Sequence, residues 1–281
     1  MKRLNSILCG TLMALVLTLF LGCKKLQDYI LKHPGSTHPD CRISKFISNS
    51  NYPQKTGVVY YNKHGNPDSV IFDYTSTGQP NLHFFYDKKN RLTDCIGMYG
   101  NGGGNDTTKP DYTGPAIPND LIATFLWHKY IYDEKNRVIG DTTYAHLLYE
   151  PGSFKPINWA EYDLGTMPHY ISHYTLDSKD RIIKKITTVY PNLTSDTINY
   201  TYGQDGNLVF PGIHYDNNIN FLRTHKIWML LSLDYSVNNP FTAAEYNNKG
   251  LPTNLGPNTP PYYYSFLYTS LKNMTIIYHC K

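Results

Sequence analysis

The sequence predicts an all-β fold of consecutive antiparallel β-hairpins that form a curled sheet or a two-layer β structure. The first observation is a turn motif that occurs seven times, in which a Tyr or Leu precedes four turn-forming residues. The second is that β-branched and aromatic residues flank these turns, as they do in strands. The third is the content of 26 Tyr, a residue that favours strand surfaces.

The N-terminal end predicts export and lipid attachment. Lys2 and Arg3 precede an apolar run that is too short to span a bilayer and that ends at Cys23. Residues 19–23, LFLGC, resemble the lipobox of bacterial lipoproteins, which implies cleavage before Cys23 and acylation of that residue. An ordinary secretory signal is the alternative. We therefore expect a signal peptide at 1–22 and a lipid-anchored tether at 23–50, followed by a hairpin-repeat domain at 51–281.

Each of the seven motifs predicts a hairpin corner. Gly, Asn and Asp tolerate the positive φ that closes such a turn, and Asp or Asn at the first position can bond the backbone two residues on. The charged stretch 85–92, FYDKKNRL, is one copy, and an active site would have to be built seven times from different residues. We therefore interpret its charges as solvated turn residues. The fourth positions of the motif are Gly65, Gly78, Asn90, Asn136, Asp180, Gly206 and Gly250.

Three segments depart from the repeat. Residues 99–120 are rich in Gly, Pro and Asn and lack periodic apolar residues, which predicts a long surface loop. The wide interval between the turns at 177–180 and 203–206 predicts a further, degenerate turn near 191–195. Residues 219–233, INFLRTHKIWMLLSL, fit either a short helix or a strand.

The repeat resembles the tyrosine-aspartate (YD) repeats of Rhs and teneurin-type proteins, which form successive β-hairpins. Together with the lipobox and the C-terminal motifs at 215–217, 236–240 and 246–252, it is similar to a family of uncharacterised Gram-negative lipoproteins. The resemblance implies an outer-membrane, lipid-anchored β protein in either leaflet. It supplies no catalytic residues to transfer.

Charge and motif content argue against several classes of function. The net charge of +4 includes Lys2 and Arg3 of the signal, and the other basic residues are scattered, so the chain lacks the footprint of a nucleic-acid-binding protein. His169 and His173 have the spacing of metal ligands on a helix, but on a strand they stand ~13 Å apart. The Gly-rich stretch 101–106 resembles a single copy of a calcium repeat, which needs stacked copies. We expect neither a metal nor a cofactor.

Three cysteines remain after removal of the signal and lipidation of Cys23. Cys41, Cys95 and Cys280 allow at most one disulfide. We rank the pair Cys41 and Cys280 first because it would tie the two ends of the domain together. Three free thiols are the alternative.

The favoured function is a non-catalytic envelope lipoprotein that binds a protein or a glycan through a Tyr-rich β surface. Its partners would be membrane lipid, through acylated Cys23, and an envelope protein or glycan. Trp159 and Tyr112, which fall in irregular stretches, are the candidate ligand contacts. The alternative is a glycan-acting hydrolase that uses paired carboxylates from the region 141–163. The acids of that region are Asp141, Glu150, Glu161 and Asp163.

Overall fold

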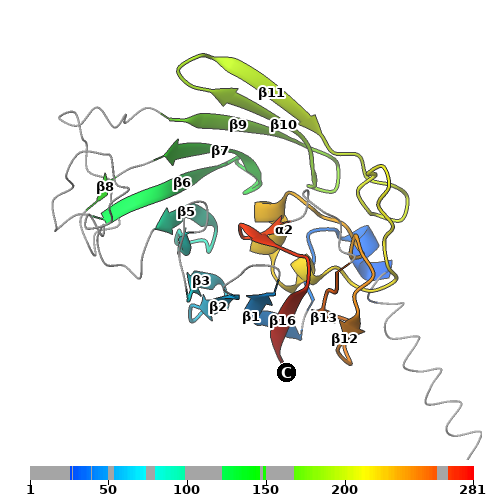
Figure 1. Cartoon of the computed structure of the whole chain (residues 1–281). Coiled ribbons are helices and arrows are strands. Elements are labelled where there is room, and N and C mark those ends of the chain that lie inside the picture. Colours follow the sequence, from blue (N-terminus) through cyan, green and yellow to red (C-terminus); the bar gives the residue numbers. More distant parts are fainter. Residues whose placement is uncertain are drawn as a thin grey trace, which may run out of the picture.

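The computed structural model describes residues 26, 28–38, 40–49, 54–73, 80–98, 122–145, 148–149, 168–257 and 265–281. Within this part of the chain, thirteen strands form one continuous antiparallel path, β8 pairs with β6, and β14 and β15 form a separate hairpin. The path runs in the order β11-β10-β9-β7-β6-β5-β4-β3-β2-β1-β16-β13-β12. It bends into an arc around helix α2 (Figure 1). The predicted all-β class of consecutive hairpins is therefore confirmed, and the sheet is not closed.

The strands and helices have the following bounds. The strands are β1 Cys41–Ser48, β2 Lys55–Tyr61, β3 Pro67–Phe72, β4 Asn81–Tyr86, β5 Leu92–Met98, β6 Ile122–Tyr132, β7 Val138–Ala145, β8 Leu148–Tyr149, β9 Tyr170–Leu176, β10 Ile182–Val189, β11 Thr194–Asn199, β12 Glu245–Tyr246, β13 Pro252–Asn254, β14 Ser265–Phe266, β15 Thr269–Ser270 and β16 Met274–Cys280. The helices are the 3₁₀ segment η1 Phe221–Thr224 and α2 Lys226–Ser232, and residues 28–32 form a further helical turn. The predicted loop at 99–120 lies outside the described residues.

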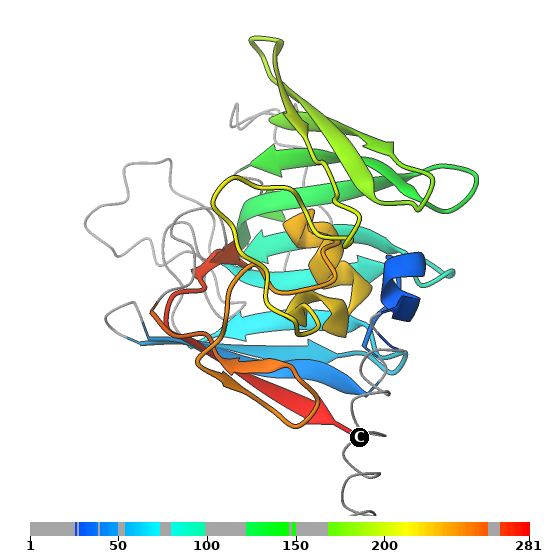
Figure 2. The ribbon, with the colours of Figure 1, turned by 90° about the vertical axis from the view of Figure 1, so that its right-hand side faces the viewer.

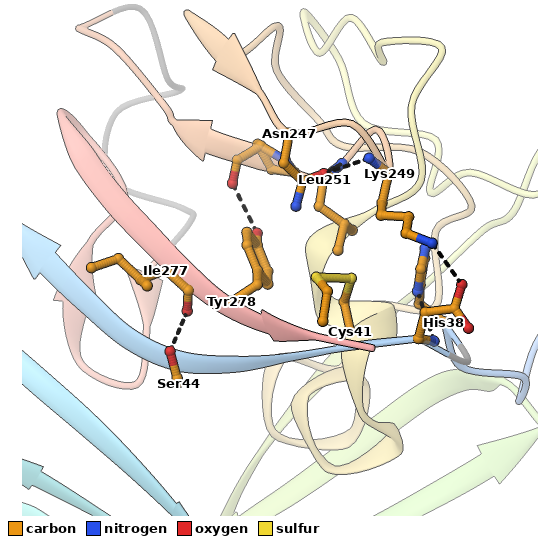
Figure 3. Close-up of a disulfide and its surroundings, with 11 residues drawn as sticks. His38, Cys41, Ser44, Asn247, Lys249, Leu251, Ile277 and Tyr278 are labelled. Atoms are coloured by element: carbon orange, nitrogen blue, oxygen red, sulfur yellow. Dashed lines mark hydrogen bonds and ion pairs between the residues drawn. A yellow bond between two sulfur atoms is a disulfide. The ribbon is translucent and has the colours of Figure 1, made fainter.

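Strand β1 lies in the middle of the sheet, between β16 and β2. Its residues were expected in the tether, so the folded part of the chain begins well before residue 51. Burial alternates along β1, with Cys41 and Ile43 facing inward around an exposed Arg42. Cys41 lies directly opposite Cys280 of β16, and the two form a disulfide (Figure 3). This is the pairing that the sequence ranked first, and Cys95 is a buried free thiol.

The predicted hairpin corners are present wherever the structure describes them. The six described fourth-position residues all have positive φ, from 57° at Asn90 to 80° at Gly65 and Gly206. In the turn at 87–90, the Asp87 amide donates to the carbonyl of Arg91, and Asp87 Oδ1 accepts from the amides of Lys89 and Arg91. The Asp87 carboxylate thus supplies the hydrogen-bond acceptor that these two turn amides would otherwise lack. The turn at 75–78 lies outside the described residues, and a further turn joins β10 to β11 at 190–193.

In two of the motifs the tyrosine also links its hairpin to the one before it. The Tyr86 hydroxyl donates to the Pro67 carbonyl at 2.7 Å, and the Tyr132 hydroxyl donates to the Leu92 carbonyl at 2.8 Å. Arg91 stacks over the Tyr132 ring, with its guanidinium carbon 4.7 Å from the ring centre, and donates to Asn136 of the next turn. Part of the high Tyr content therefore stabilises the stacking of hairpins rather than forming a free surface.

Two glycines of the repeat allow the stability cost of backbone strain to be distinguished from the cost of overpacking. Gly65 and Gly206 occupy the same turn position with φ of 80°, but a Cβ at Gly206 would lie 2.7 Å from Leu31 and Val237, whereas nothing lies within 4 Å at Gly65. We expect Gly65→Ala to lower the free energy of unfolding by about 1–2 kcal/mol through the left-handed backbone. Gly206→Ala should lower it by a further 1–3 kcal/mol or so through overpacking. Urea unfolding of both variants measures the difference, and equal losses would contradict the described contact.

Residues 219–233, for which the sequence left helix and strand open, form η1 and α2. The helix α2 begins where the His225 side chain accepts from the Ile227 amide at 3.2 Å, and it ends at Leu233, whose φ is 50°. Ile227, Trp228, Met229 and Leu230 are all buried because the sheet and the β14-β15 hairpin surround this helix. The Trp228 ring lies 6.0 Å from Phe84 of the sheet and 5.5 Å from Phe266 of the hairpin, centre to centre. A helix enclosed in this way has no polar face to set a helical period.

Candidate functional site

The concave face of the sheet changes character between β5 and β6. On β2 to β5 its side chains are apolar and buried, and they pack against η1, α2 and the β14-β15 hairpin. These inward residues are Val59, Val70, Phe72, Leu82 and Phe84. This part of the face forms the main hydrophobic core.

From β6 to β10 the same face carries polar side chains. The register places Cys95 opposite His128, His128 opposite Thr143, and Asp141 opposite Ser172, so these residues share one face. Ser172 in turn lies opposite Thr187, and Tyr174 lies opposite Lys185. Burial of polar groups costs free energy unless they are hydrogen-bonded, so an inward polar row requires an explanation.

A cavity of about 420 Å³ lies over this polar row. Its floor comes from β6, β7, β9 and β10, and its opposite wall from Leu230–Leu233 at the end of α2 and from Leu267 and Tyr268 between β14 and β15. The aromatic rings of Tyr130, Tyr170, Tyr174 and Tyr268 line it together with the polar side chains of the row. Its size falls in the range of small-molecule sites, ~300–1,000 Å³.

Asp141 anchors the polar row from the middle of β7. Its Oδ2 contacts His128 Nδ1 at 3.2 Å and accepts from the Thr143 hydroxyl at 2.9 Å, and its Oδ1 accepts from the Tyr174 hydroxyl. Burial alone would raise the pKa of Asp141, but the hydrogen bond and charge of His128, with Tyr174 and Lys185, hold it at about 2. Burial, followed by the Asp141 charge and hydrogen bond, raises the pKa of Tyr174. At neutral pH the pair is therefore a carboxylate and a neutral phenol.

The residue types of a nucleophilic triad, Cys95, His128 and Asp141, lie on three adjacent strands of this face. No hydrogen bond joins Cys95 to His128 in the described part of the chain. Burial, together with a smaller effect of the Asp94 charge, raises the pKa of the Cys95 thiol to about 12. Because the thiolate is the nucleophilic form, a thiol held protonated in this way does not act as one at neutral pH. The contacts of His128 within the described residues run through Nδ1, which leaves Nε2 for a ligand.

The structure places only part of the predicted site residues. Asp141 is the one acid of the region 141–163 that it describes, and it lies in the cavity. Cys41 begins β1 and Cys280 ends β16, and neither residue lines this cavity. The remaining predicted residues lie outside the described part of the chain, namely Cys23, Tyr112, Glu150, Trp159, Glu161 and Asp163.

Sequence reasoning missed His128, Ser172, Tyr174, Lys185 and Thr187. The available signal was alternation, because polar residues in these strands occupy the positions that face inward. This alternation could be interpreted only with the pairing register of the strands on either side of residues 99–121 and 150–167. The local sequence does not give that register. His169 and His173 were considered as metal ligands, and a strand was expected at their position. His169 directly precedes strand β9 and His173 lies within it.

The described residues show no three His, Cys, Asp or Glu side chains placed to hold a metal ion together. The helices in that part of the chain are also too short or too polar to cross a bilayer.

No family model matches the sequence, and no curated protein is similar to it. Among solved structures, the chain is similar to one described as "Crystal Structure of TcdB2-TccC3-TEV", with 11% sequence identity and a TM-score of 0.27. The match covers 71% of this chain and 9% of that chain. A likeness at this TM-score supports no argument about function.

Proposed function

We propose that this chain is a lipid-anchored envelope protein that binds the end of a glycan in the concave cavity without transforming it. The observation that carries the proposal is the polar row on an inward face. A sheet that needed only a core would continue the apolar side chains of β2 to β5, because inward polar groups reduce stability unless they are compensated. Departures from such local rules occur mainly at functional sites.

The chemistry of the cavity suits a polyhydroxylated ligand. Tyr130, Tyr170 and Tyr268 offer flat faces against which the C–H groups of a sugar ring can pack. Ser172, Thr187, Lys185 and the Nε2 atom of His128 offer donors and acceptors for hydroxyl groups. Asp141 and Lys185 have opposite charges within one cavity, which favours a neutral ligand over a strongly charged one.

The ionisation and hydrogen bonding of Asp141 argue against the alternative function, a glycan hydrolase. Most such enzymes use two carboxyl groups, one of them protonated as the general acid. Asp141 is ionised, and both of its oxygens accept hydrogen bonds from neighbouring side chains. No second Asp or Glu lines the described part of the cavity. We therefore assign Asp141 the role of holding His128 and Tyr174 in position.

The lipid anchor rests on the sequence. The segment 19–23 resembles a lipobox, and acyl chains on Cys23 would hold the protein at a bilayer without a membrane-spanning helix. The outer membrane is the proposed location because of the resemblance to Gram-negative lipoproteins.

A glycan array with product analysis tests the proposal. Residues 24–281 contain every described residue and can be used in soluble form. We expect saturable binding to at least one glycan, with the glycan recovered intact. Cleavage of a bound glycan would establish the hydrolase instead. Binding only to envelope proteins would contradict the assignment of a sugar ligand.

A further inference from the structure

The six described turns of the repeat lie along one edge of the sheet, which we call the turn edge. It comprises residues 62–66, 87–91, 133–137, 177–181, 203–207 and 247–251. Strands alternate in direction, so the five of these turns that connect paired strands fall on one edge. The turn at 203–207 follows the end of β11, which runs antiparallel to β10 and therefore toward the same edge. The turn edge contains nine Lys and Arg against six Asp and Glu, a net charge of +3. Without Lys2 and Arg3 the whole chain has a net charge of +2, so the rest of it is slightly negative.

Three of the six acids on the turn edge are neutralised within their own turns. Asp87 pairs with Arg91 at 2.6 Å, and the same pairing recurs in the next two turns between Asp133 and Arg137 and between Asp177 and Arg181. Each of these carboxylates also accepts backbone hydrogen bonds in its turn. The side chains that project into solvent are more basic. The exposed lysines are Lys63, Lys88, Lys89, Lys135 and Lys179, against exposed Glu134, Asp180 and Asp205.

The N-terminal segment runs along this same edge. The Lys179 ammonium donates to the Leu31 carbonyl at 3.4 Å, and Lys249 of the last turn pairs with Asp40 at 3.3 Å (Figure 3). The helical turn at 28–32 is fixed there because Ile30 is fully buried and packs with Ile219 and Val237. Figure 2 shows this helical turn, in blue, on the side of the sheet from which the turns project.

The distance from the proposed anchor to this edge is short. Cys23 precedes Leu26 by three positions, and an extended chain covers at most about 11 Å over that length. An acylated Cys23 would therefore bring the neighbouring turns close to the bilayer surface. Lysines close to an anionic surface strengthen binding by roughly fivefold each.

We infer that the turn edge is a membrane-facing surface that binds anionic lipid headgroups through its exposed lysines. This orientation rests on the proposed lipidation of Cys23, whereas the affinity of the edge for headgroups does not. The cavity belongs to the concave face and not to the turn edge, so this surface is distinct from the proposed glycan site.

Flotation of soluble residues 24–281 with lipid vesicles tests the headgroup affinity. We expect the protein to float with vesicles that contain phosphatidylglycerol and not with vesicles of phosphatidylcholine alone. Added salt should weaken this binding, because it screens exposed charges. Equal flotation with both kinds of vesicle, or with neither, would overturn the inference.

A matched pair of triple variants locates the binding surface. Replacement of Lys63, Lys88 and Lys135 by Gln should weaken binding on the order of 100-fold. The control replaces Lys45, Lys184 and Lys272 by Gln, which removes the same charge from outside the turn edge. It should leave binding within a few-fold of wild type, and thermal melts check that both variants fold. If both triple variants lose vesicle binding equally, the binding depends on net charge alone. That result would contradict a binding surface at the turn edge.

Metabolic labelling of the full chain with a radioactive fatty acid tests the anchor separately. Wild type should incorporate label and Cys23→Ala should not. If wild type is not acylated at Cys23, the orientation is overturned even when the turn edge prefers anionic vesicles. If it is acylated but shows no such preference, the headgroup contact is overturned and the anchor stands.

Discussion

Replacement of Arg223 by Met should lower the free energy of unfolding by several kcal/mol, at about 1–3 kcal/mol for each buried carbonyl that loses its donor. Arg223 is fully buried, and its guanidinium donates to the carbonyls of Pro34 and Ser36 on one side and of Tyr235 and Ser236 on the other. It therefore ties the N-terminal segment to the core. Burial lowers the pKa of Arg223 to about 10, so the side chain keeps its charge at neutral pH.

Urea unfolding and limited proteolysis measure this effect together. The Arg223→Met variant should also be cut between residues 26 and 40 under conditions in which wild type is not, because the carbonyls that hold the segment lose their donors. Arg42→Met is the matched control, since Arg42 is exposed on β1 and stacks on Tyr61. We expect it to cost less than about 1 kcal/mol. If Arg223→Met lowers the free energy of unfolding by no more than Arg42→Met does, the hydrogen bonds of Arg223 to the N-terminal segment do not stabilise the fold.

Replacement of both Cys41 and Cys280 by Ser should lower the free energy of unfolding by about 2–5 kcal/mol. The disulfide joins residues 239 positions apart and closes most of the folded chain into one loop, which restricts the unfolded state. Reduction of wild type should produce the same loss, whereas Cys95→Ser should leave the effect of reductant unchanged. Unfolding curves that do not respond to reductant would contradict a disulfide in the mature protein.

The turn positions could be predicted from sequence because turn chemistry is local. A residue such as Asn90 at the fourth position, after Asp87 at the first, specifies its own φ and its own hydrogen bonds over four residues. The hairpins follow from these corners, since each corner pairs the two strands beside it. The turn between β10 and β11 was predicted in a different way, from the wide interval between the two turns that flank it.

Features that depend on distant parts of the chain were missed. The sequence assigned β1 to the tether because its partner β16 lies at the opposite end of the chain. Residues 219–233 gave no clear period because α2 is enclosed by the sheet on most sides. The polar row was missed because His128 and Tyr174 meet around Asp141 only through the register of three strands. Of the proposed site, sequence identified Asp141 alone.

A matched pair of variants on β10 determines whether the ligand occupies the concave cavity. Thr187 lines the cavity, whereas its neighbour Thr188 points to the opposite face of the same strand. Isothermal titration with the best glycan from the array should show that Thr187→Trp weakens binding at least about tenfold by filling the cavity. Thr188→Trp should bind as wild type does. Equal affinity of Thr187→Trp and wild type would place the ligand elsewhere on the molecule and contradict binding in the cavity.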